Sequence, residues 1–374
     1  MILLLHNRYR TPGGEERVVE DLARLLPEHL GEDVEVLERD SAALSSPAAA
    51  RGLLRGGLDP REVADAVRRT GARVVHAHNV HPSLGWRALA AAREAGARTV
   101  LTLHQYRLVC AVGTCVDPSG SDCTRCHGRD TRPGVRLNCR GSRPEGLAYA
   151  TALARWSGRL VACADALTTP SAFTLDRLRV LGAPLGGRDV AVVPNPVAPV
   201  PSGERARPAD GAYALVAGRL ATDKGVDVAI TACAAEGLPL VVAGAGPQEA
   251  QLRALAARLG GDVTFAGRVG AAELARLRAG AALALVPSRL AESFGLSCAE
   301  AMAAGLPVAA SRVGALTELL PDEDLAPMGD AAALGALARR LWGDAAAGER
   351  NARVVGERAA PAAVARDLTR VYAG

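Results

Sequence analysis

The chain has 374 residues, which exceeds the length of about 250 residues at which single hydrophobic cores stop growing, so we expect two domains. The formal net charge is only +4 and no dense basic run occurs, which disfavours nucleic-acid binding. No apolar stretch reaches the roughly 18 to 20 residues of a membrane span, and the start MILLLHNRYR lacks the features of a signal peptide. We therefore expect a cytoplasmic protein with at most peripheral membrane contact.

The first 190 residues alternate short apolar runs with helical patterns. MILLLH predicts a strand, and the apolar spacing of GGEERVVEDLARLL predicts a helix after it. ARVVHAHN and RTVLTLH predict further strands on either side of the helix WRALAAAREAG, and ALTTPS and DVAVVPNPV predict two more. This order predicts β-α-β units with parallel strands that are covered on both faces.

The segment 198–211, APVPSGERARPADG, is rich in Pro, Gly and charge and is predicted to be a linker. The alternation then restarts, with strands predicted in YALVAGRL, PLVVAGAG, DVTFAGRV, AALALVPS and PVAAS and with helices between them. The expected domains are 1–197, with a Cys-rich insertion at about 110–140, and 212–356. A C-terminal helix, 357–374, is expected to pack back on the first domain. The predicted fold is α/β, with two Rossmann-like doubly wound domains facing a cleft, where ligands bind at the carboxyl ends of the strands.

GRLATDKG, 218–225, contains the only lysine of the chain. Arg219 ends the predicted strand and Lys224 precedes a predicted helix. Two cations at a strand end beside a helix N-terminus suit a diphosphate, because arginine grips two oxygens and lysine is a compact point charge. A surface lysine without a role is the alternative explanation.

Two glutamates, Glu292 and Glu300, stand eight residues apart in ESFGLSCAEAMAAGLPVAAS. We expect Glu292 just before a helix and Glu300 two turns along it, so that both contact one elongated ligand. An ionised Glu300 would accept hydrogen bonds from two ribose hydroxyls, and Glu292 would hold sugar hydroxyls. Gly295 would let backbone amides approach an anion. Two solvated glutamates are the alternative.

These stretches, in this order, resemble the group 1, family GT4 glycosyltransferases with the GT-B fold. The resemblance rests on AGRLATDKG, VVAGAGPQ, VTFAGRV and the E-x7-E spacing of Glu292 and Glu300, and it extends to PGGEE, LTLHQYRLVC and VPNPV in the first half. It covers essentially the whole chain. It implies a retaining enzyme that transfers a sugar from a UDP- or GDP-linked donor to a hydroxyl or amine, with no catalytic metal expected.

The resemblance also implies roles for individual residues. Arg219 and Lys224 would neutralise the donor diphosphate, Glu300 would bind the ribose, and Glu292 would hold the transferred sugar. The backbone of Phe294, Gly295 and Leu296 would approach the sugar and phosphate, and Arg268 and Val269 would bind the base.

In the first domain, Gly13 and Gly14 separate a strand from its helix and match the glycine loop of the family, where the backbone approaches a phosphate or the acceptor. His104 ends a predicted strand, and the family resemblance implies that it contacts the donor sugar near the reacting centre. Three histidines, His76, His78 and His81, follow one another closely in VVHAHNVHP. We interpret this segment as the lining of the acceptor side rather than a metal site, with His78 and Asn79 as acceptor-side candidates. Asn195 in VPNPV is expected where the domains meet.

Five cysteines fall within 30 residues: Cys110, Cys115, Cys123, Cys126 and Cys139. Cys123 and Cys126 form a C-x2-C pair, and with Cys110 and Cys139 they would complete a tetrahedral structural zinc site in a loop with little apolar content. A subset of the resembled family has a similar cysteine-bearing insertion. Free thiols or a disulfide remain open alternatives. Cys163, Cys233 and Cys298 have apolar neighbours and are expected in the core.

Other readings remain open at this stage. A nucleotide-sugar epimerase or a phosphorylase of the same architecture is one, although a phosphorylase needs a pyridoxal-bearing lysine and Lys224 already occupies the diphosphate position. A zinc-stapled, non-enzymatic binding protein is the other. The expected partners are a small-molecule sugar donor and a carbohydrate, lipid-linked or natural-product acceptor. The donor base, the sugar, the acceptor and the oligomeric state do not follow from the sequence.

Overall fold

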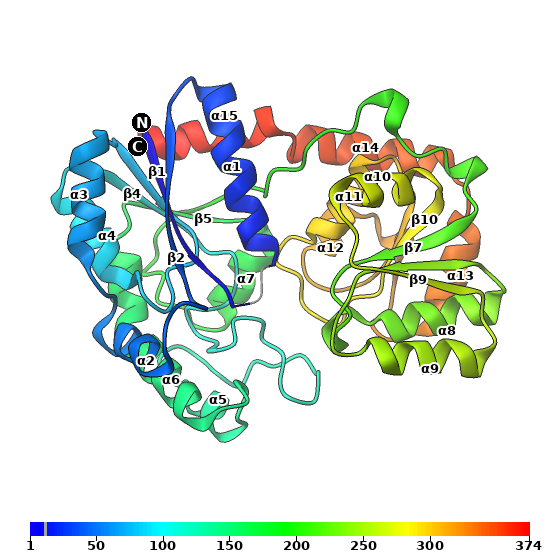
Figure 1. Ribbon diagram of the computed structural model, residues 1–374, viewed down its shortest axis with the longest axis horizontal. Coiled ribbons are helices and arrows are strands. Elements are labelled where there is room, and N and C mark those ends of the chain that lie inside the picture. The colour runs from blue at the N-terminus through cyan, green and yellow to red at the C-terminus, as the bar shows by residue number, and fades with distance from the viewer. Residues whose placement is uncertain (11–12) are drawn as a thin grey trace. The chain divides into compact units, whose positions relative to one another are not determined.

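The structure is a computed structural model that describes residues 1–10 and 13–374. The chain forms two compact units (Figure 1). Unit 1 comprises Met1–Ser119, Cys123–Pro196 and Pro361–Gly374, and unit 2 comprises Gly120–Asp122 and Val197–Ala360. The segment 198–211 belongs to unit 2, where it contains two short 3₁₀ turns.

Unit 1 contains a parallel six-stranded sheet in the order β2-β1-β3-β4-β5-β6. The central strands β1 and β3 are mainly apolar and almost entirely buried, as expected for a sheet covered by helices on each side. The strands of unit 1 are β1 (Ile2–Arg8), β2 (Val34–Asp40), β3 (Val74–Ala77), β4 (Arg98–Thr102), β5 (Ala166–Thr169) and β6 (Val190–Val192).

The β2 strand was not expected from the sequence. Its segment VEVLERD contains three apolar and four charged residues, and it lies at an edge of the sheet with part of its surface in water. A search for continuous apolar runs therefore does not find it.

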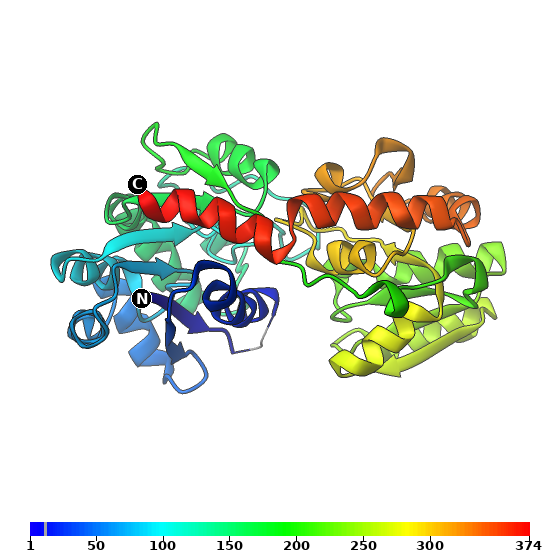
Figure 2. The same ribbon diagram turned by 90° about the horizontal axis from the view of Figure 1, so that it is seen from above.

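Helices cover both faces of the unit 1 sheet. Leu3 and Leu5 of β1 pack into a core formed with α3, α4, α6 and α7, whereas Ile2 and Leu4 point to the opposite face and pack against α1 and α15. The C-terminal helix α15 thus lies beside α1, and Figure 2 shows the two helices on the same side of the sheet. The helices of unit 1 are α1 (Gly14–Leu30), α2 (Ser46–Arg55), α3 (Pro60–Thr70), α4 (Gly85–Glu94), α5 (Arg132–Arg136), α6 (Arg143–Ala162), α7 (Ala172–Val180) and α15 (Pro361–Ala373).

Unit 2 repeats this architecture with a parallel sheet in the order β12-β11-β10-β7-β8-β9. One face packs against α8, α9 and α13, and the other against α11, α12 and α14. The strands are β7 (Tyr213–Ala217), β8 (Leu240–Ala243), β9 (Val263–Gly267), β10 (Ala281–Val286), β11 (Val308–Ser311) and β12 (Leu325–Ala326). The helices are α8 (Val226–Glu236), α9 (Glu249–Leu259), α10 (Ala271–Ala279), α11 (Leu296–Ala303), α12 (Leu316–Leu319), α13 (Ala331–Leu341) and α14 (Ala345–Arg358).

The predicted fold class is confirmed, because each unit is a doubly wound parallel sheet.

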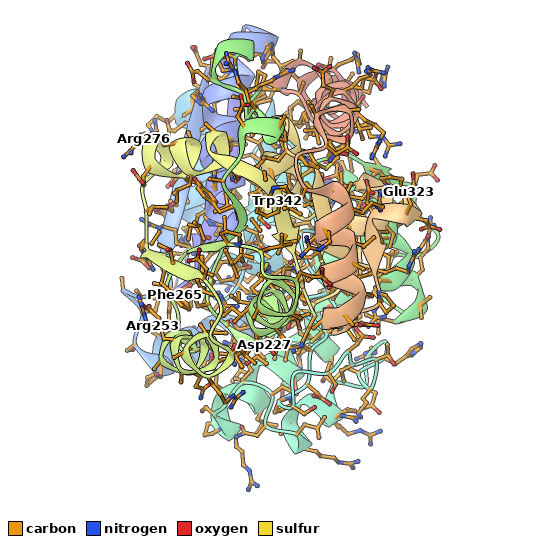
Figure 3. All side chains as sticks on the ribbon, turned by 90° about the vertical axis from the view of Figure 1, so that its right-hand side faces the viewer. Asp227, Arg253, Phe265, Arg276, Glu323 and Trp342 are labelled. Carbon is orange, nitrogen blue, oxygen red and sulfur yellow. The ribbon has the colours of Figure 1, made fainter. Side chains whose placement is uncertain are left out.

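On the outer surface of unit 2, Arg253 of α9 stacks its guanidinium 4.5 Å from the ring centre of Phe265 in β9 (Figure 3). Across the part of the chain that the structure describes, no helix has the length and apolar content needed to cross a membrane.

Candidate functional site

Three loops meet at the carboxyl ends of β7, β10 and β11 in unit 2. The backbone N–H of Arg289 donates to Asp223 O at 2.8 Å, and that of Ala315 donates to Glu292 O at 2.8 Å. Two glycines make this approach possible. A Cβ on Gly225, at φ +63°, would lie 2.0 Å from Pro287 O, and a Cβ on Gly314, at φ +58°, would lie 2.3 Å from Glu292 N.

These loops place Lys224 beside Glu292. Lys224 Nζ donates to Glu292 Oε1 at 2.6 Å, and Ser288 Oγ donates to the same oxygen at 2.9 Å. Ser288 is buried, and the side chains of Lys224 and Glu292 are 29% and 13% exposed. One carboxylate oxygen therefore accepts two hydrogen bonds in a partly desolvated position. Ser288 was not found from the sequence, because a serine before a loop has no distinctive pattern.

The pair keeps Lys224 charged. Burial acts to lower the pKa of Lys224, but the negative charge and hydrogen bond of Glu292 outweigh it, so the pKa of Lys224 is raised above its ordinary value. The site thus presents a fixed ammonium group that is already paired with a carboxylate.

Arg219 lies two residues past the end of β7 and is more exposed than expected for a diphosphate ligand. Its side chain is 55% exposed, and its Nη2 donates to Asp223 Oδ1 at 3.1 Å. A second arginine of these loops, Arg289, forms a two-point ion pair with Asp227 at 2.7 Å for each contact.

Glu300 lies nearer the start of its helix than predicted. Because α11 begins at Leu296, Glu300 is its fifth residue, just over one turn along and not two. Its Oε2 accepts from Arg278 Nη2 of α10, and both side chains are nearly buried. Arg278 was not identified from the sequence.

The other predicted donor-binding residues of unit 2 lie around the same strand ends. Gly295, at φ +83°, immediately precedes α11, and Phe294 is 5% exposed within the core. Leu296 opens the helix and is half-buried. Arg268 and Val269 follow β9 directly, with Arg268 exposed and Val269 partly packed against the core.

In unit 1, a cavity that opens to solvent lies at the carboxyl ends of β3 and β4 and is lined by both His78 and His104. His78 Nδ1 lies 2.8 Å from His104 Nε2, so one ring donates to the other. Burial lowers the pKa of His104 to about 3 and that of His78 well below its ordinary value, so both rings are neutral at pH 7. Within residues 1–10 and 13–374, His78 Nε2 is buried and has no hydrogen-bond partner.

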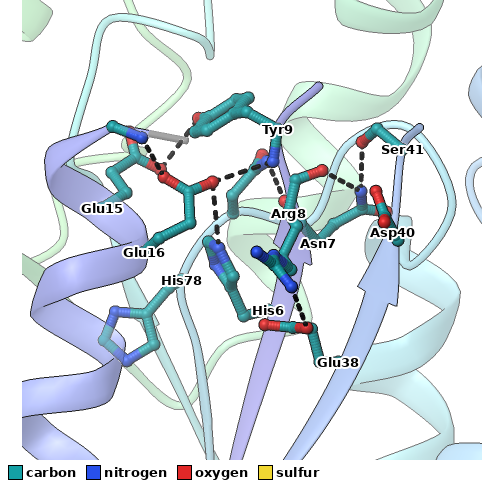
Figure 4. A network of polar contacts seen from close by, with 12 residues as sticks. His6, Asn7, Arg8, Tyr9, Glu15, Glu16, Glu38, Asp40, Ser41 and His78 are labelled. Atoms are coloured by element: carbon teal, nitrogen blue, oxygen red, sulfur yellow. Dashed lines mark hydrogen bonds and ion pairs between the residues drawn. The ribbon is translucent and has the colours of Figure 1, made fainter. Parts of the chain in front are cut away.

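A carboxylate holds the two ends of the glycine loop together (Figure 4). Glu16 Oε1 accepts from Tyr9 N at 2.8 Å and Glu16 Oε2 accepts from Gly13 N at 2.7 Å, while His6 Nε2 lies 3.5 Å from Oε1. Burial acts to raise the pKa of Glu16, but His6 and these backbone donors lower it to about 2. The backbone N–H of Gly13 is thus bonded to Glu16. Gly14 is the first residue of α1.

The cavity also contains polar groups that the sequence did not reveal. Tyr9 OH donates to Glu15 Oε2 at 2.8 Å, and the Arg107 guanidinium lies 5.0 Å from the Tyr9 ring centre. Burial raises the pKa of Glu15 in spite of the nearby Arg107. All three residues line the cavity.

The remaining unit 1 candidates make largely internal contacts. His76 Nδ1 lies 2.8 Å from Tyr372 OH of α15, and its Nε2 lies 2.7 Å from Thr102 Oγ1. Asn79 donates to Asn7 O at 2.6 Å and accepts from His81 N at 3.1 Å, so its amide bonds to neighbouring backbone. His81 also lines the cavity, and Asn195 follows β6 and is half-buried.

The zinc site predicted for four cysteines stays a prediction. In residues 1–10 and 13–374, no group of three or more His, Cys, Asp or Glu side chains is arranged to hold a metal ion. Cys110, Cys123, Cys126 and Cys139 are free thiols, each half-buried. Cys233 and Cys298 are buried as expected, whereas Cys163 is only half-buried.

Solved structures resemble the chain over its full length. Anabaena Alr3699/HepE in complex with UDP has a TM-score of 0.65 at 18% identity, with 100% of both chains covered. Sucrose-phosphate synthase from Thermosynechococcus elongatus has a TM-score of 0.68 at 20% identity, covering 100% of this chain and 98% of that one. At such identities the likeness shows the fold alone, which is GT-B.

Sequence relatives and family models are more specific. Glycogen synthase of Mycobacterium tuberculosis is 36% identical over 213 residues, which are 53% of this chain and 50% of that protein. The chain therefore spans about half the length of this curated relative. The model "Glycosyl transferases group 1" matches residues 202–355, and the model "Glycosyltransferase Family 4" matches residues 12–200, just over half of the chain. The chain belongs to glycosyltransferase family 4.

Proposed function

We propose that this chain is a retaining glycosyltransferase that acts in the cytoplasm. It transfers a sugar from a UDP- or GDP-linked donor to a hydroxyl or amine of a carbohydrate, lipid-linked or natural-product acceptor. The observation that carries the proposal is the Lys224–Glu292 pair, at 2.6 Å, where the β7 and β10 loops meet. The HepE structure that shares this fold contains UDP, which supports a nucleotide donor. The family matches do not favour an epimerase, a phosphorylase or a zinc-stapled binding protein.

The pair is suited to exchange partners when a donor binds. Lys224 forms an ion pair with the single carboxylate of Glu292, and a diphosphate offers its ammonium group a stronger anionic partner. Glu292 then becomes available to accept hydrogen bonds from hydroxyls of the sugar, while Ser288 keeps its carboxylate oriented. Glu300, held by Arg278, accepts from the ribose hydroxyls.

In the proposed reaction, the bond between the anomeric carbon and the diphosphate oxygen breaks, and the acceptor atom bonds to the same face of that carbon. The acceptor proton passes to an oxygen of the leaving phosphate. Negative charge grows on the diphosphate as the bond breaks, and Lys224 and Arg219 stabilise it there. His104 contacts the transferred sugar, as the family resemblance implies.

Donor hydrolysis without an acceptor tests this proposal. UDP- and GDP-sugars are incubated with the wild-type chain, with Lys224→Met and with the control Arg353→Met, which alters an exposed arginine far along the sequence in the same unit. We expect slow release of UDP or GDP by the wild type and the control, and a loss of about 10²–10³-fold in Lys224→Met. Equal rates in Lys224→Met and the wild type would remove the proposed role of Lys224. Failure of every donor to be hydrolysed, with no thermal stabilisation by UDP or GDP, would overturn the proposed function.

A further inference from the structure

Two neighbouring helices of unit 1, α2 and α6, carry basic and apolar side chains on their outward surfaces. They pack together through Leu53 of α2 and Ala152 and Leu153 of α6, and they lie side by side in Figure 1. We call their exposed side chains the α2–α6 face. It consists of Arg51, Leu54 and Arg55 of α2 and Arg143, Leu147, Arg155 and Arg159 of α6.

The α6 residues of this face form one continuous stripe. Arg143, Leu147, Thr151, Arg155 and Arg159 follow one another at intervals of four, and all are exposed. Each step of four residues turns about 40° around the helix, so the stripe extends about 24 Å along α6 while it turns by roughly 160° from Arg143 to Arg159. Arg155 and Arg159, about one turn apart, lie on the same side of α6, and this spacing brings cations together in a chain without a dense basic run.

Trp156 of α6 is bonded to α2 and also pairs with Trp86 of the neighbouring helix α4. Trp156 Nε1 donates to Leu54 O at 3.1 Å, and the Trp86 and Trp156 ring centres lie 5.7 Å apart. Arg155 lies 4.7 Å from the Trp156 ring centre, and Arg159 lies 5.0 Å from that of Trp86. The arginines therefore rest on aromatic rings and leave their N–H donors available to an external partner.

The face has no compensating negative charge. In the described residues, none of its five arginines forms an ion pair, although many other arginines of the chain do. The α2 sequence SPAAARGLLR contains no acidic residue, and Glu145, the one acidic residue of α6, is bound to Arg140. Leu54 and Leu147 are 47% and 59% exposed beside these cations. Five unpaired cations next to exposed leucines indicate a surface that is complementary to an anionic, partly apolar partner.

We propose that the α2–α6 face binds the surface of an anionic phospholipid bilayer. The guanidinium groups bind lipid phosphates, to which arginine donates two hydrogen bonds at once. Leu54, Leu147 and the edge of Trp156 enter the boundary between headgroups and acyl chains. A nucleic acid also offers phosphates, but it has no apolar layer to receive the two leucines, so the lipid surface fits the whole face better. This inference does not depend on the proposed function.

Vesicle sedimentation of the full chain tests the proposal. The probes are vesicles of phosphatidylcholine alone and of phosphatidylcholine mixed with phosphatidylglycerol, at low and high salt. We expect binding only to the mixed vesicles, weakened by salt. The variant Arg51→Ser/Arg55→Ser/Arg155→Ser/Arg159→Ser should lose more than about 100-fold in affinity, since each basic side chain near an anionic surface contributes roughly fivefold. Leu54→Ser/Leu147→Ser should weaken the binding that persists at high salt.

The matched control removes four exposed arginines from other surfaces, as Arg61→Ser/Arg258→Ser/Arg353→Ser/Arg366→Ser. It should bind like the wild type, and an equal loss in both quadruple variants would overturn a specific face. Brominated phosphatidylglycerol gives a second readout that leaves the face intact. The variant Trp342→Phe keeps only Trp86 and Trp156 as tryptophans. Vesicles that contain the brominated lipid should quench the tryptophan fluorescence of this variant. Absence of quenching, or binding of duplex or single-stranded oligonucleotides in place of vesicles, would overturn the proposal.

Discussion

Lys224 Nζ lies 2.6 Å from Glu292 Oε1, although 68 residues separate the two in sequence. The only lysine of the chain is thus held by a glutamate of the E-x7-E motif. The arrangement satisfies the lysine in the absence of a donor and keeps it charged. The predictions below test this pair, the neighbouring nucleotide contacts and the polar networks of unit 1.

The stability of Lys224 variants should depend on Glu292. Lys224→Met leaves a carboxylate that is 13% exposed with Ser288 as its remaining side-chain donor, and we expect a loss of about 2–3 kcal/mol in the free energy of unfolding. Lys224→Met/Glu292→Gln removes the uncompensated charge and should recover much of that loss. Urea unfolding of the wild type, of both variants and of Glu292→Gln gives the four free energies of unfolding of a double-mutant cycle. Additive effects would show that the two side chains are not coupled.

Glu292→Gln should separate catalysis from nucleotide binding. Its proposed contact is to the sugar, so the variant should lower kcat by about 10²-fold while the Kd for UDP or GDP changes little. Steady-state kinetics and calorimetry of the bare nucleotide measure the two quantities. Comparable losses in both would contradict a sugar-specific role.

Glu300→Gln should weaken nucleotide binding through the ribose. We expect a rise in Kd of about tenfold, because hydrogen bonds to a charged acceptor are stronger than those to a neutral one. The wild type should discriminate against 2′-deoxy-UDP or 2′-deoxy-GDP, and the variant should discriminate less. If both proteins penalise the deoxynucleotide equally, Glu300 does not bind the ribose hydroxyls.

Glu16 should contribute stability that disappears in acid. Its folded pKa is about 2 against an ordinary 4.5, so its contribution is complete above about pH 4.5 and is lost as the pH falls toward 2. The shift corresponds to at most about 3 kcal/mol. Unfolding of the wild type and of Glu16→Gln between neutral pH and about pH 3 should therefore show a difference that shrinks as the pH falls.

Other groups also destabilise the fold in acid, but they are common to both proteins. Burial lowers the pKa values of His76 and His104 to about 3. The unfolded chain therefore binds protons at these histidines below about pH 6.5 while the folded chain does not, and the free energy of unfolding falls with the pH. Glu20→Gln, an exposed change in the same helix, is the control. A difference between the wild type and Glu16→Gln that does not vary with pH would contradict the ionic role of Glu16.

Tyr372→Phe should destabilise unit 1 through its partner His76. The hydroxyl and the ring are fully buried, so losing the 2.8 Å contact leaves His76 Nδ1 without a partner at a cost of about 1–3 kcal/mol. Arg370→Ala, which alters an exposed pair within the same helix, should change stability little. Thermal unfolding of the two variants measures the contrast. Similar small effects in both would mean that the contact between His76 and Tyr372 contributes little to the stability of unit 1.

The sequence by itself determined the class of the fold and the positions of most of its buried strands, although the two-residue strand β12 was not predicted. Strands such as β1, β3 and β10 are continuous apolar runs because helices cover both faces of the sheet, and burial of such runs is a local property of composition. The spacing of Glu292 and Glu300 and the segment GRLATDKG around Lys224 likewise identified the family, since these are local patterns. The edge strand β2 was missed because its outward residues are charged.

Only the tertiary structure decided which side chains meet. The partners of Lys224, Glu300 and His104 come from distant segments, and their pairing depends on the sheet order and on loop geometry. The predicted zinc site of the four cysteines depends on such contacts too, and in the described residues no group of three or more potential ligands is arranged to hold a metal ion. The same reason explains the α2–α6 face, whose arginines are dispersed in sequence and gathered by two packed helices. Spacing along a chain shows local periodicity. Which distant segments come into contact is decided by how the whole core packs, and this does not follow from the spacing.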